Sequence, residues 1–315
     1  MTTSGTDRGH QPVMAREVVR LMATNHDGAF IDLTVGSGGH LKAIAAVLGP
    51  AARLYGLDKD PLAVSRAGQN LRDYPQFKRV VQASYADLAS VADLLEDNEF
   101  DGILMDLGIS SDQLDDAGRG FSFRYEGLLD MRYNSQSGVR NAADLVNTLE
   151  EKELAEIIGG FGEERLARRL AAAIVRERRS KMIRTTFDLA RIVTNTVPPP
   201  HRTKSLARVF QAFRIAVNSE LEELTGMLPV ALSLLKEGGR LGAIAYHSLE
   251  DRIVKRFFQR EEKGCICPPN LPVCVCGRLP GLKIITRKAV KPDESEKSTN
   301  PRSRSARFRV AEKIN

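Results

Sequence analysis

Stretches of mostly apolar residues alternate with helical patterns along the first third of the chain, and once more near residue 240. Five of these stretches have the length and the aliphatic content of buried strands: 29–35, 52–58, 78–83, 100–107 and 240–248. Helical patterns follow the first two of them, at 40–49 and 61–71. Strands that alternate with helices are typical of a parallel, doubly wound sheet. The sequence therefore predicts an α/β fold.

The alternation stops after Gly108. Residues 109–140 are rich in Gly, Ser, Asp and Arg and predict an irregular loop, whereas 142–196 is helical in pattern throughout. The prolines at 198–200 end that region, and a long amphipathic helix is expected from about Ser205 to Leu235. We therefore expect an all-helical insertion, residues 112–215, that recognises the substrate. Residues 1–111 and 216–315 would form the two parts of the sheet domain.

The end of the chain shows a different pattern. Residues 283–290 predict a strand and 291–301 a linker. In residues 305–312, Ala306, Phe308 and Val310 alternate with arginines, as a half-buried strand requires.

Charge and hydropathy narrow the class of protein. The 315 residues carry a net charge of +6 with a pI near 9.2, which suits a polyanionic partner. No apolar run approaches the roughly 18 residues of a membrane helix, and the first residues have no apolar core of a signal peptide. We expect a soluble, cytoplasmic protein with no membrane partner.

Basic residues concentrate in two places. The range 163–184 contains only three glutamates but eight basic residues. These are Arg165, Arg168, Arg169, Arg176, Arg178, Arg179, Lys181 and Arg184. Since Leu166, Leu170 and Ile174 form the apolar stripe there, the cations should point outward, either to bind phosphates or as a solvated face. A second patch is expected from the arginines of the tail: Arg302, Arg304, Arg307 and Arg309.

A glycine loop carries the first chemical signal. Gly36, Gly38 and Gly39 follow the first predicted strand directly and precede a helix, which lets the backbone approach a ligand closely. Asp58 ends the second strand, 20 residues after Gly38, where a carboxylate can accept both hydroxyls of a ribose. Ordinary strand-to-helix turns are the alternative.

The choice of cofactor depends on what the loop lacks. A dinucleotide fingerprint has a third glycine where this chain has Leu41, so NAD is disfavoured. S-adenosylmethionine needs no pyrophosphate site. Asp32 and Asp106 end the first and fourth predicted strands, and such strand ends converge on one crevice, so Asp58 and Asp106 should face the same ligand.

Longer motifs resemble the bacterial ribosomal RNA small-subunit methyltransferase H family. They run from about residue 10 to 313: HQPVM, DLTVGSGGH, GILMDLGISSDQLD, RGFSF, LDMR, FGEERLARRLA, FQAFRIAVNSEL, HSLEDRIVKRFF and NPRSRSARFRV. The resemblance implies a Rossmann-like class I methyltransferase sheet and N4-methylation of a cytidine in the decoding region of small-subunit ribosomal RNA, within a 30S-like particle. It does not decide whether the protein is a monomer or a homodimer.

The resemblance also implies the residues that contact S-adenosyl-L-methionine. They are Gly38, Gly39, His40, Asp58, Tyr85, Asp106 and Gln113. Tyr85 stands where phenylalanine is usual in the family, and either ring could pack on adenine. Tyr246 likewise replaces a phenylalanine before HSLEDR, and RTKSLA at 202–207 departs from the family pattern.

Asp106 is the candidate catalytic residue. The amino nitrogen of cytosine is a poor nucleophile, and an acceptor for one of its hydrogens would help it rehybridise. Asp106 at a strand end could do this, or could only orient the cofactor. Carbon-5 methylation would need a cysteine nucleophile, but every cysteine lies at 265–276. The target base should be flipped or unpaired.

The sequence also leaves several residue roles and alternative functions open. His247 and Ser248 should end the last strand on the crevice side, with His247 structural or substrate-facing, and Asp251 and Arg252 should pair within a helix. A methyltransferase for DNA or protein amines, or a non-catalytic RNA-binding assembly factor, are alternative functions. Four cysteines could hold a structural zinc ion or stay reduced thiols: Cys265, Cys267, Cys274 and Cys276.

Overall fold

The chain folds into two compact units, which we call the sheet unit and the helical unit. The computed structural model describes residues 12–268, 273 and 275–315. The sheet unit contains the chain up to Gly108 and from Glu223 onward, and the helical unit is Ile109–Glu222. Each unit has its own apolar core.

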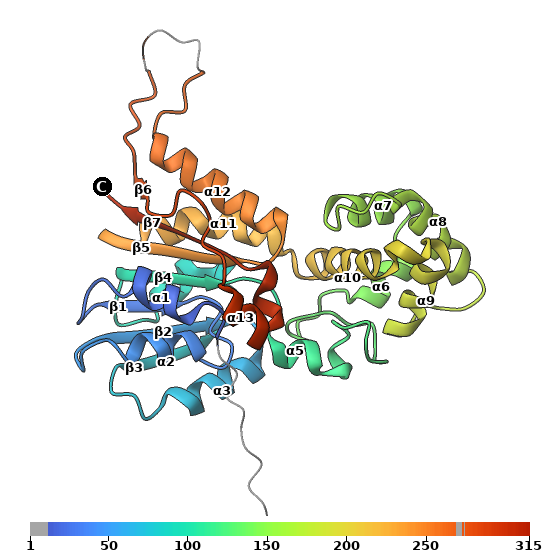
Figure 1. Cartoon of the computed structure of the whole chain (residues 1–315), viewed down its shortest axis with the longest axis horizontal. Coiled ribbons are helices and arrows are strands. Elements are labelled where there is room, and N and C mark those ends of the chain that lie inside the picture. Colours follow the sequence, from blue (N-terminus) through green and yellow to red (C-terminus); the bar gives the residue numbers. More distant parts are fainter. Residues whose placement is uncertain (1–11, 269–272, 274) are drawn as a thin grey trace, which may run out of the picture. The chain divides into compact units, whose positions relative to one another are not determined.

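A seven-stranded sheet forms the centre of the sheet unit (Figure 1). Its strands are β1 (Ala29–Asp32), β2 (Arg53–Asp58), β3 (Phe77–Gln82), β4 (Phe100–Asp106), β5 (Leu235–Ala245), β6 (Leu282–Ile284) and β7 (Arg307–Lys313). The order is β3-β2-β1-β4-β5-β7-β6; β1 to β5 are parallel, and β7 is antiparallel to both of its neighbours. The class I methyltransferase-type sheet expected from the sequence is thus confirmed.

Helices cover both faces of this sheet, as parallel strands require. On one face the core includes α4 (Leu88–Ala92), α11 (Glu220–Ser233) and α12 (Ser248–Lys263). On the other face α1 (Ala15–Met22), α2 (Gly39–Ala45) and α3 (Pro61–Leu71) pack through residues such as Val18, Leu41 and Leu71. The central strands β1 and β4 are buried along nearly their whole length, which explains their continuous apolar sequence.

The helical unit is built on a second core of leucines, isoleucines and phenylalanines. Its helices are α5 (Ser111–Asp115), α6 (Ala142–Thr148), α7 (Glu151–Gly160), α8 (Ala167–Arg178), α9 (Thr186–Thr196) and α10 (Arg202–Asn218). Capping boxes begin four of them: Ser110 with Gln113, Asn141 with Asp144, Glu150 with Glu153, and Thr185 with Asp188. Helix α5 lies within residues 109–140, for which the sequence predicted only an irregular loop.

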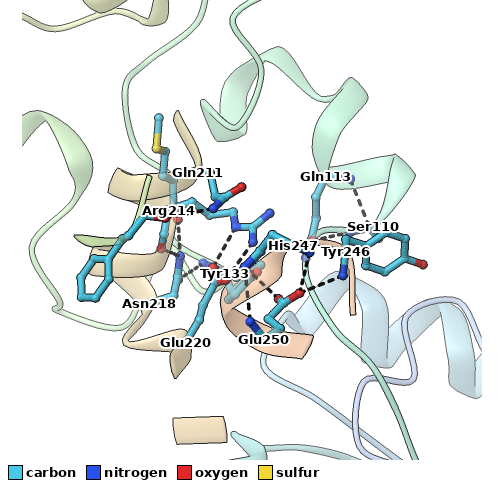
Figure 2. A network of polar contacts seen from close by, with 12 residues as sticks. Ser110, Gln113, Tyr133, Gln211, Arg214, Asn218, Glu220, Tyr246, His247 and Glu250 are labelled. Atoms are coloured by element: carbon cyan, nitrogen blue, oxygen red, sulfur yellow. Dashed lines mark hydrogen bonds and ion pairs between the residues drawn. The ribbon is translucent and has the colours of Figure 1, made fainter. Parts of the chain in front are cut away.

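The single long helix predicted for 205–235 is wrong, because the chain turns at Ser219. This residue adopts a left-handed conformation (φ 50°) and separates α10 from α11. The Asn218 side chain donates to Met131 O at 2.7 Å and accepts from Tyr133 N–H at 2.9 Å, and Arg214 pairs with Glu220 at 2.9 Å (Figure 2). These contacts stabilise the turn between α10 and α11, where the sequence has neither glycine nor proline to indicate a helix end.

Two predictions near the end of the chain also need correction. The expected linker at 291–301 contains helix α13 (Glu294–Thr299), whose N-cap Asp293 accepts from Glu296 N–H at 2.7 Å. The strand expected at 283–290 is only the three residues of β6. By contrast, the alternation in β7 is confirmed, since Ala306, Phe308 and Val310 are all buried.

Among the described residues, no helix is both long and apolar enough to cross a membrane.

Candidate active site

Three carboxylates end three neighbouring strands of the sheet. Asp58, Asp32 and Asp106 are the last residues of β2, β1 and β4, and these strands pair in parallel, so their carboxyl ends lie at the same edge. The strand order reverses between β1 and β4. A crevice outside the strand ends at such a switch point is where this class of sheet binds ligands.

The glycine loop connects β1 to α2 above this edge. Gly36 and Gly38 have φ of 53° and 87°, a region in which side chains with a Cβ are strained. A Cβ at Gly38 would also approach Leu71 Cδ1 to 3.0 Å, so glycine is required there on two grounds. The loop amide of Gly36 donates to Asp58 Oδ2 at 2.9 Å, which fixes the loop against the end of β2.

Asp58 has acceptor capacity left for a ligand. Its Oδ2 accepts from Gly36 N–H and its Oδ1 from Asp60 N–H, each at 2.9 Å. An ionised carboxylate offers about four lone-pair sites, so about two remain for a pair of hydroxyls. Burial is the main cause that raises the pKa of Asp58 to about 6, although both amide hydrogen bonds act in the opposite direction.

Thr34 links the carboxylate of Asp32 to the main chain of Asp106. Asp32 Oδ1 accepts from Thr34 N–H at 3.0 Å and from the Thr34 hydroxyl at 3.2 Å, and Thr34 Oγ1 accepts from Asp106 N–H at 2.6 Å. Asp32 is 1% exposed, and its Oδ2 has no hydrogen-bond partner among the described residues. Burial raises the pKa of Asp32 to about 6.

Two side chains hold the carboxylate of Asp106. The Tyr246 hydroxyl donates to Oδ1 at 2.8 Å, and His40 Nε2 lies 3.3 Å from Oδ2. The Asp106 side chain is still 23% exposed, so a ligand can reach it. His40 is buried, and its Nδ1 has no partner among the described residues. Burial alone would lower the pKa of His40, but Asp106 and Asp32 outweigh it and raise the pKa.

Tyr85 stands beside the end of β2. It begins a short 3₁₀ helix (Tyr85–Asp87) just after β3, and Lys59 Nζ lies 5.6 Å from the centre of its ring. Lys59 also forms an ion pair with Glu223, which accepts from the Ser84 hydroxyl at 2.9 Å. The half-buried ring thus lies near Lys59, the residue that follows Asp58 in the chain.

Gln113, the remaining expected cofactor contact, lies in the helical unit. It is buried in α5, and its side chain accepts from Ser110 N–H at 3.0 Å while its own N–H donates to Ser110 Oγ at 3.2 Å (Figure 2). These contacts give it a capping role within α5. Its contact with the cofactor stays a prediction.

His247 also has a structural role. β5 ends at Ala245, so His247 is not a strand residue as predicted but the N-cap of α12. Glu250 Oε2 accepts from Tyr246 N–H at 2.9 Å and His247 N–H at 3.3 Å, and Glu250 N–H donates to His247 Nδ1 at 3.4 Å (Figure 2). Together these bonds orient Tyr246, which contacts Asp106.

The predicted pairing of Asp251 with Arg252 is wrong. Asp251 instead accepts from Arg309 at 2.6 and 3.3 Å and from Arg307 at 3.1 Å, because β7 runs beside α12. Arg309 is only 11% exposed. The second basic patch predicted for the tail is correspondingly reduced, since these two arginines hold α12 to β7.

The first basic patch is largely outward-facing. Five arginines on α8 or directly beside its two ends are exposed: Arg165, Arg168, Arg169, Arg176 and Arg179. Arg178 is an exception, because its guanidinium donates to Val146 O at 2.9 Å and Leu149 O at 2.7 Å. Lys181 pairs with Asp188 at 3.1 Å. As predicted, Leu170 and Ile174 are buried.

A hollow of about 490 Å³ lies at the start of α8, within the helical unit. Gly159 and Gly160 at the end of α7 form part of its wall, and Arg165, Arg168 and Arg169 form another part. None of the three arginines has a hydrogen-bond or ion-pair partner among the described residues. The hollow is therefore a concave, positively charged surface.

Sequence reasoning did not find Thr34, which connects Asp32 to Asp106. It noted Tyr246 only as a departure from a pattern, although the hydroxyl that distinguishes it from phenylalanine is the group that contacts Asp106. A threonine two residues after an aspartate in a strand-to-loop turn was the available signal, but such turns are common.

Comparisons with known proteins agree across nearly the whole chain. The family model of the MraW methylase family matches residues 7–314. A curated protein named ribosomal RNA small subunit methyltransferase H, from Geotalea uraniireducens, is 46% identical over 98% of this chain and 100% of its own length. The protein of the same name from Thermomicrobium roseum is 46% identical over 97% of this chain and 94% of its own length.

Similarity extends to solved structures. The alignment with the solved structure of an rRNA methylase from Streptococcus thermophilus covers 96% of this chain and 94% of the methylase, with 10% identity and a TM-score of 0.40. The match over residues 7–314 and the level of identity to the curated relatives place this protein in a family: the chain belongs to the MraW methylase family.

Proposed function

We propose that this protein transfers a methyl group from S-adenosylmethionine to N4 of a cytidine in the decoding region of small-subunit ribosomal RNA. The observation that carries the proposal is the convergence of Asp58, Asp32 and Asp106 beneath a glycine loop. Two buried polar atoms there, Asp32 Oδ2 and His40 Nδ1, have no hydrogen-bond partner in the part of the chain that the structure describes. The names of the curated relatives support ribosomal RNA as the substrate.

The crevice fits the proposed cofactor. Asp58 has lone pairs for the ribose hydroxyls, and the half-buried Tyr85 ring, near Lys59 that follows Asp58 in the chain, would offer a surface for adenine. The unpartnered Asp32 Oδ2 and His40 Nδ1 are placed to meet the polar groups of the methionine part. When bound, S-adenosylmethionine supplies an electrophilic methyl group on a positively charged sulfur.

Asp106 is the group that acts on the substrate in this proposal. The two donors Tyr246 and His40 fix its carboxylate in one orientation, and the remaining lone pairs can accept a hydrogen of the cytidine amino group. That hydrogen bond localises the nitrogen lone pair for attack. As N4 gains the methyl group it loses one proton, which the Asp106 carboxylate would accept. Positioning of the two reactants supplies much of the remaining acceleration.

The helical unit would hold the RNA. Its hollow at Arg165, Arg168 and Arg169 suits phosphate oxygens, because the arginines are not neutralised by acidic partners among the described residues. Phosphate contacts of this kind supply affinity rather than sequence selectivity. We propose that the RNA is held as a single strand, in which the cytidine can leave the stack and enter the crevice of the sheet unit.

Asp106→Asn separates catalysis from cofactor binding. Calorimetry should give an affinity for S-adenosylmethionine within a few-fold of the wild type, whereas single-turnover methylation of small-subunit ribosomal RNA should fall by about 100-fold or more. The matched control is Asp130→Asn: Asp130 is paired with Arg132 at 2.7 Å within the helical unit, and its substitution should leave the cofactor affinity unchanged. Full turnover by Asp106→Asn would remove the catalytic role and leave Asp106 an orienting residue.

A further inference from the structure

A cysteine cluster lies outside the crevice, in the connection between α12 and β6 (Figure 1). Gly264, with φ of 67°, ends α12, and Cys265 and Cys267 follow it; Cys276 lies on the returning part of the segment. The three sulfur atoms all lie within 4.8 Å of one another. The predicted fourth member, Cys274, lies outside the described residues.

The burial pattern of this segment is the reverse of that of a protein core. The aliphatic side chains that the structure describes here are exposed: Ile266, Val273, Val275 and Leu279 are 59%, 70%, 79% and 73% exposed. The three cysteines are half-buried. Among the described residues of 265–279, no aliphatic side chain is buried, so apolar packing does not hold this part of the chain together.

The distance between two of the sulfur atoms matches a tetrahedral metal site. With a Zn–S bond of about 2.3 Å, two thiolates in a tetrahedral shell lie about 3.8 Å apart. Cys276 Sγ and Cys265 Sγ are 3.8 Å apart, whereas a disulfide would bring them to about 2.05 Å. Val275 N–H donates to Cys267 Sγ at 3.5 Å, a contact that stabilises a thiolate.

We propose that Cys265, Cys267 and Cys276 bind one structural zinc ion. The ion fastens the end of α12 to the segment that returns to β6, and so takes the place of the apolar packing that is missing among the described residues of 265–279. Thiolate-rich, tetrahedral sites select zinc among the redox-inert metals of the cell. Structural zinc sites are four-coordinate, so one further donor completes the shell.

Metal analysis of the full-length protein tests the proposal. The protein is purified without chelators and without an immobilised-metal column, and its zinc is measured by mass spectrometry. We expect about one zinc per chain, with X-ray absorption giving Zn–S bonds of about 2.3 Å. Protein that contains no zinc and takes up none when reduced and titrated with the metal would overturn the proposal, as would iron or copper in place of zinc.

Substitutions identify the ligands. Cys265→Ser and Cys276→Ser should lose most of the zinc, while the control variants Ile266→Ala and Val275→Ala in the same segment should retain it. Equal zinc content in all four would contradict the assignment. Should a serine variant not fold, thiol titration of the wild type decides: the cysteines should react slowly with Ellman's reagent until a strong chelator removes the metal. Unchanged reactivity would overturn the proposal.

Discussion

Substitution of Asp32 by asparagine should weaken the binding of S-adenosylmethionine without lowering the free energy of unfolding. The Asp32 side chain is 1% exposed, Thr34 satisfies only Oδ1, and Oδ2 has no partner among the described residues. Burial raises its pKa from 3.8 to about 6. The folded protein therefore binds this proton more tightly than the unfolded chain, so the stability it contributes is present below about pH 4 and lost as the pH rises through 6.

The size of the effect follows from the pKa. At pH 7 the ionised carboxylate costs the folded state about 3 kcal/mol relative to an unperturbed aspartate. Asp32→Asn removes that charge and can keep both bonds from Thr34, but it buries an amide N–H at a cost of about 1–3 kcal/mol. The free energy of unfolding should therefore stay unchanged or rise by up to about 2 kcal/mol. For a unit of this size, that is a Tm increase of at most about 8 °C.

Asp101→Asn is the matched control, with the opposite sign expected. Asp101 accepts from Lys236, Asn25 and the Ala29 amide, each at 2.8 Å. Burial works against its charge, but these three bonds outweigh it and lower its pKa. Removal of the charge should reduce the stability by about 1–3 kcal/mol.

Urea denaturation and thermal melts at pH 7 measure both variants. If the proposed cofactor role holds, Asp32→Asn should also bind S-adenosylmethionine roughly 10- to 100-fold more weakly, because a charged acceptor is lost. Equal destabilisation by Asp32→Asn and Asp101→Asn would refute the reasoning that the charge of Asp32 is uncompensated in the free protein.

Three further outcomes are expected. Because burial raises the pKa of Asp58 to about 6, its carboxylate is protonated below that pH, and calorimetry should show cofactor affinity falling about tenfold for each pH unit below 6; a flat profile would exclude Asp58 as the ribose acceptor. Asp251→Asn breaks the largely buried contact with Arg309 and should lower the free energy of unfolding by about 3 kcal/mol in urea titrations, whereas an effect below about 0.5 kcal/mol would make the pair dispensable. Arg168→Gln combined with Arg169→Gln should reduce the slope of log affinity against log salt by about 1.4 for single-stranded RNA, and an unchanged slope would place the RNA elsewhere.

The sheet and its ligand edge could be predicted because local patterns decide them. Buried parallel strands read as continuous apolar runs, which is why β1 and β4 were found within a few residues of their ends. Three of the five predicted strands, the first, second and fourth, have an aspartate at or near their carboxyl ends, and the parallel arrangement alone brings Asp32, Asp58 and Asp106 to one edge. The position of the candidate site thus follows from strand order and polarity.

Contacts between distant segments could not be predicted in the same way. Asp251 has an arginine next to it in sequence, yet it pairs with Arg309, 58 residues away, because β7 inserts beside β5. The turn at Ser219 depends on Asn218 contacting the chain 87 residues earlier. Such partners are set by tertiary packing, which overrides local propensity.

The product of the reaction tests the central claim most directly. Small-subunit ribosomal RNA lacking its modifications, free and within 30S particles, is incubated with the protein and S-adenosylmethionine carrying an isotopically labelled methyl group. The RNA is then digested to nucleosides and analysed by mass spectrometry. We expect label in N4-methylcytidine, at one position of the decoding region, and none with Asp106→Asn. Label in 5-methylcytidine or in a purine, or no label from protein that binds the cofactor, would contradict the account.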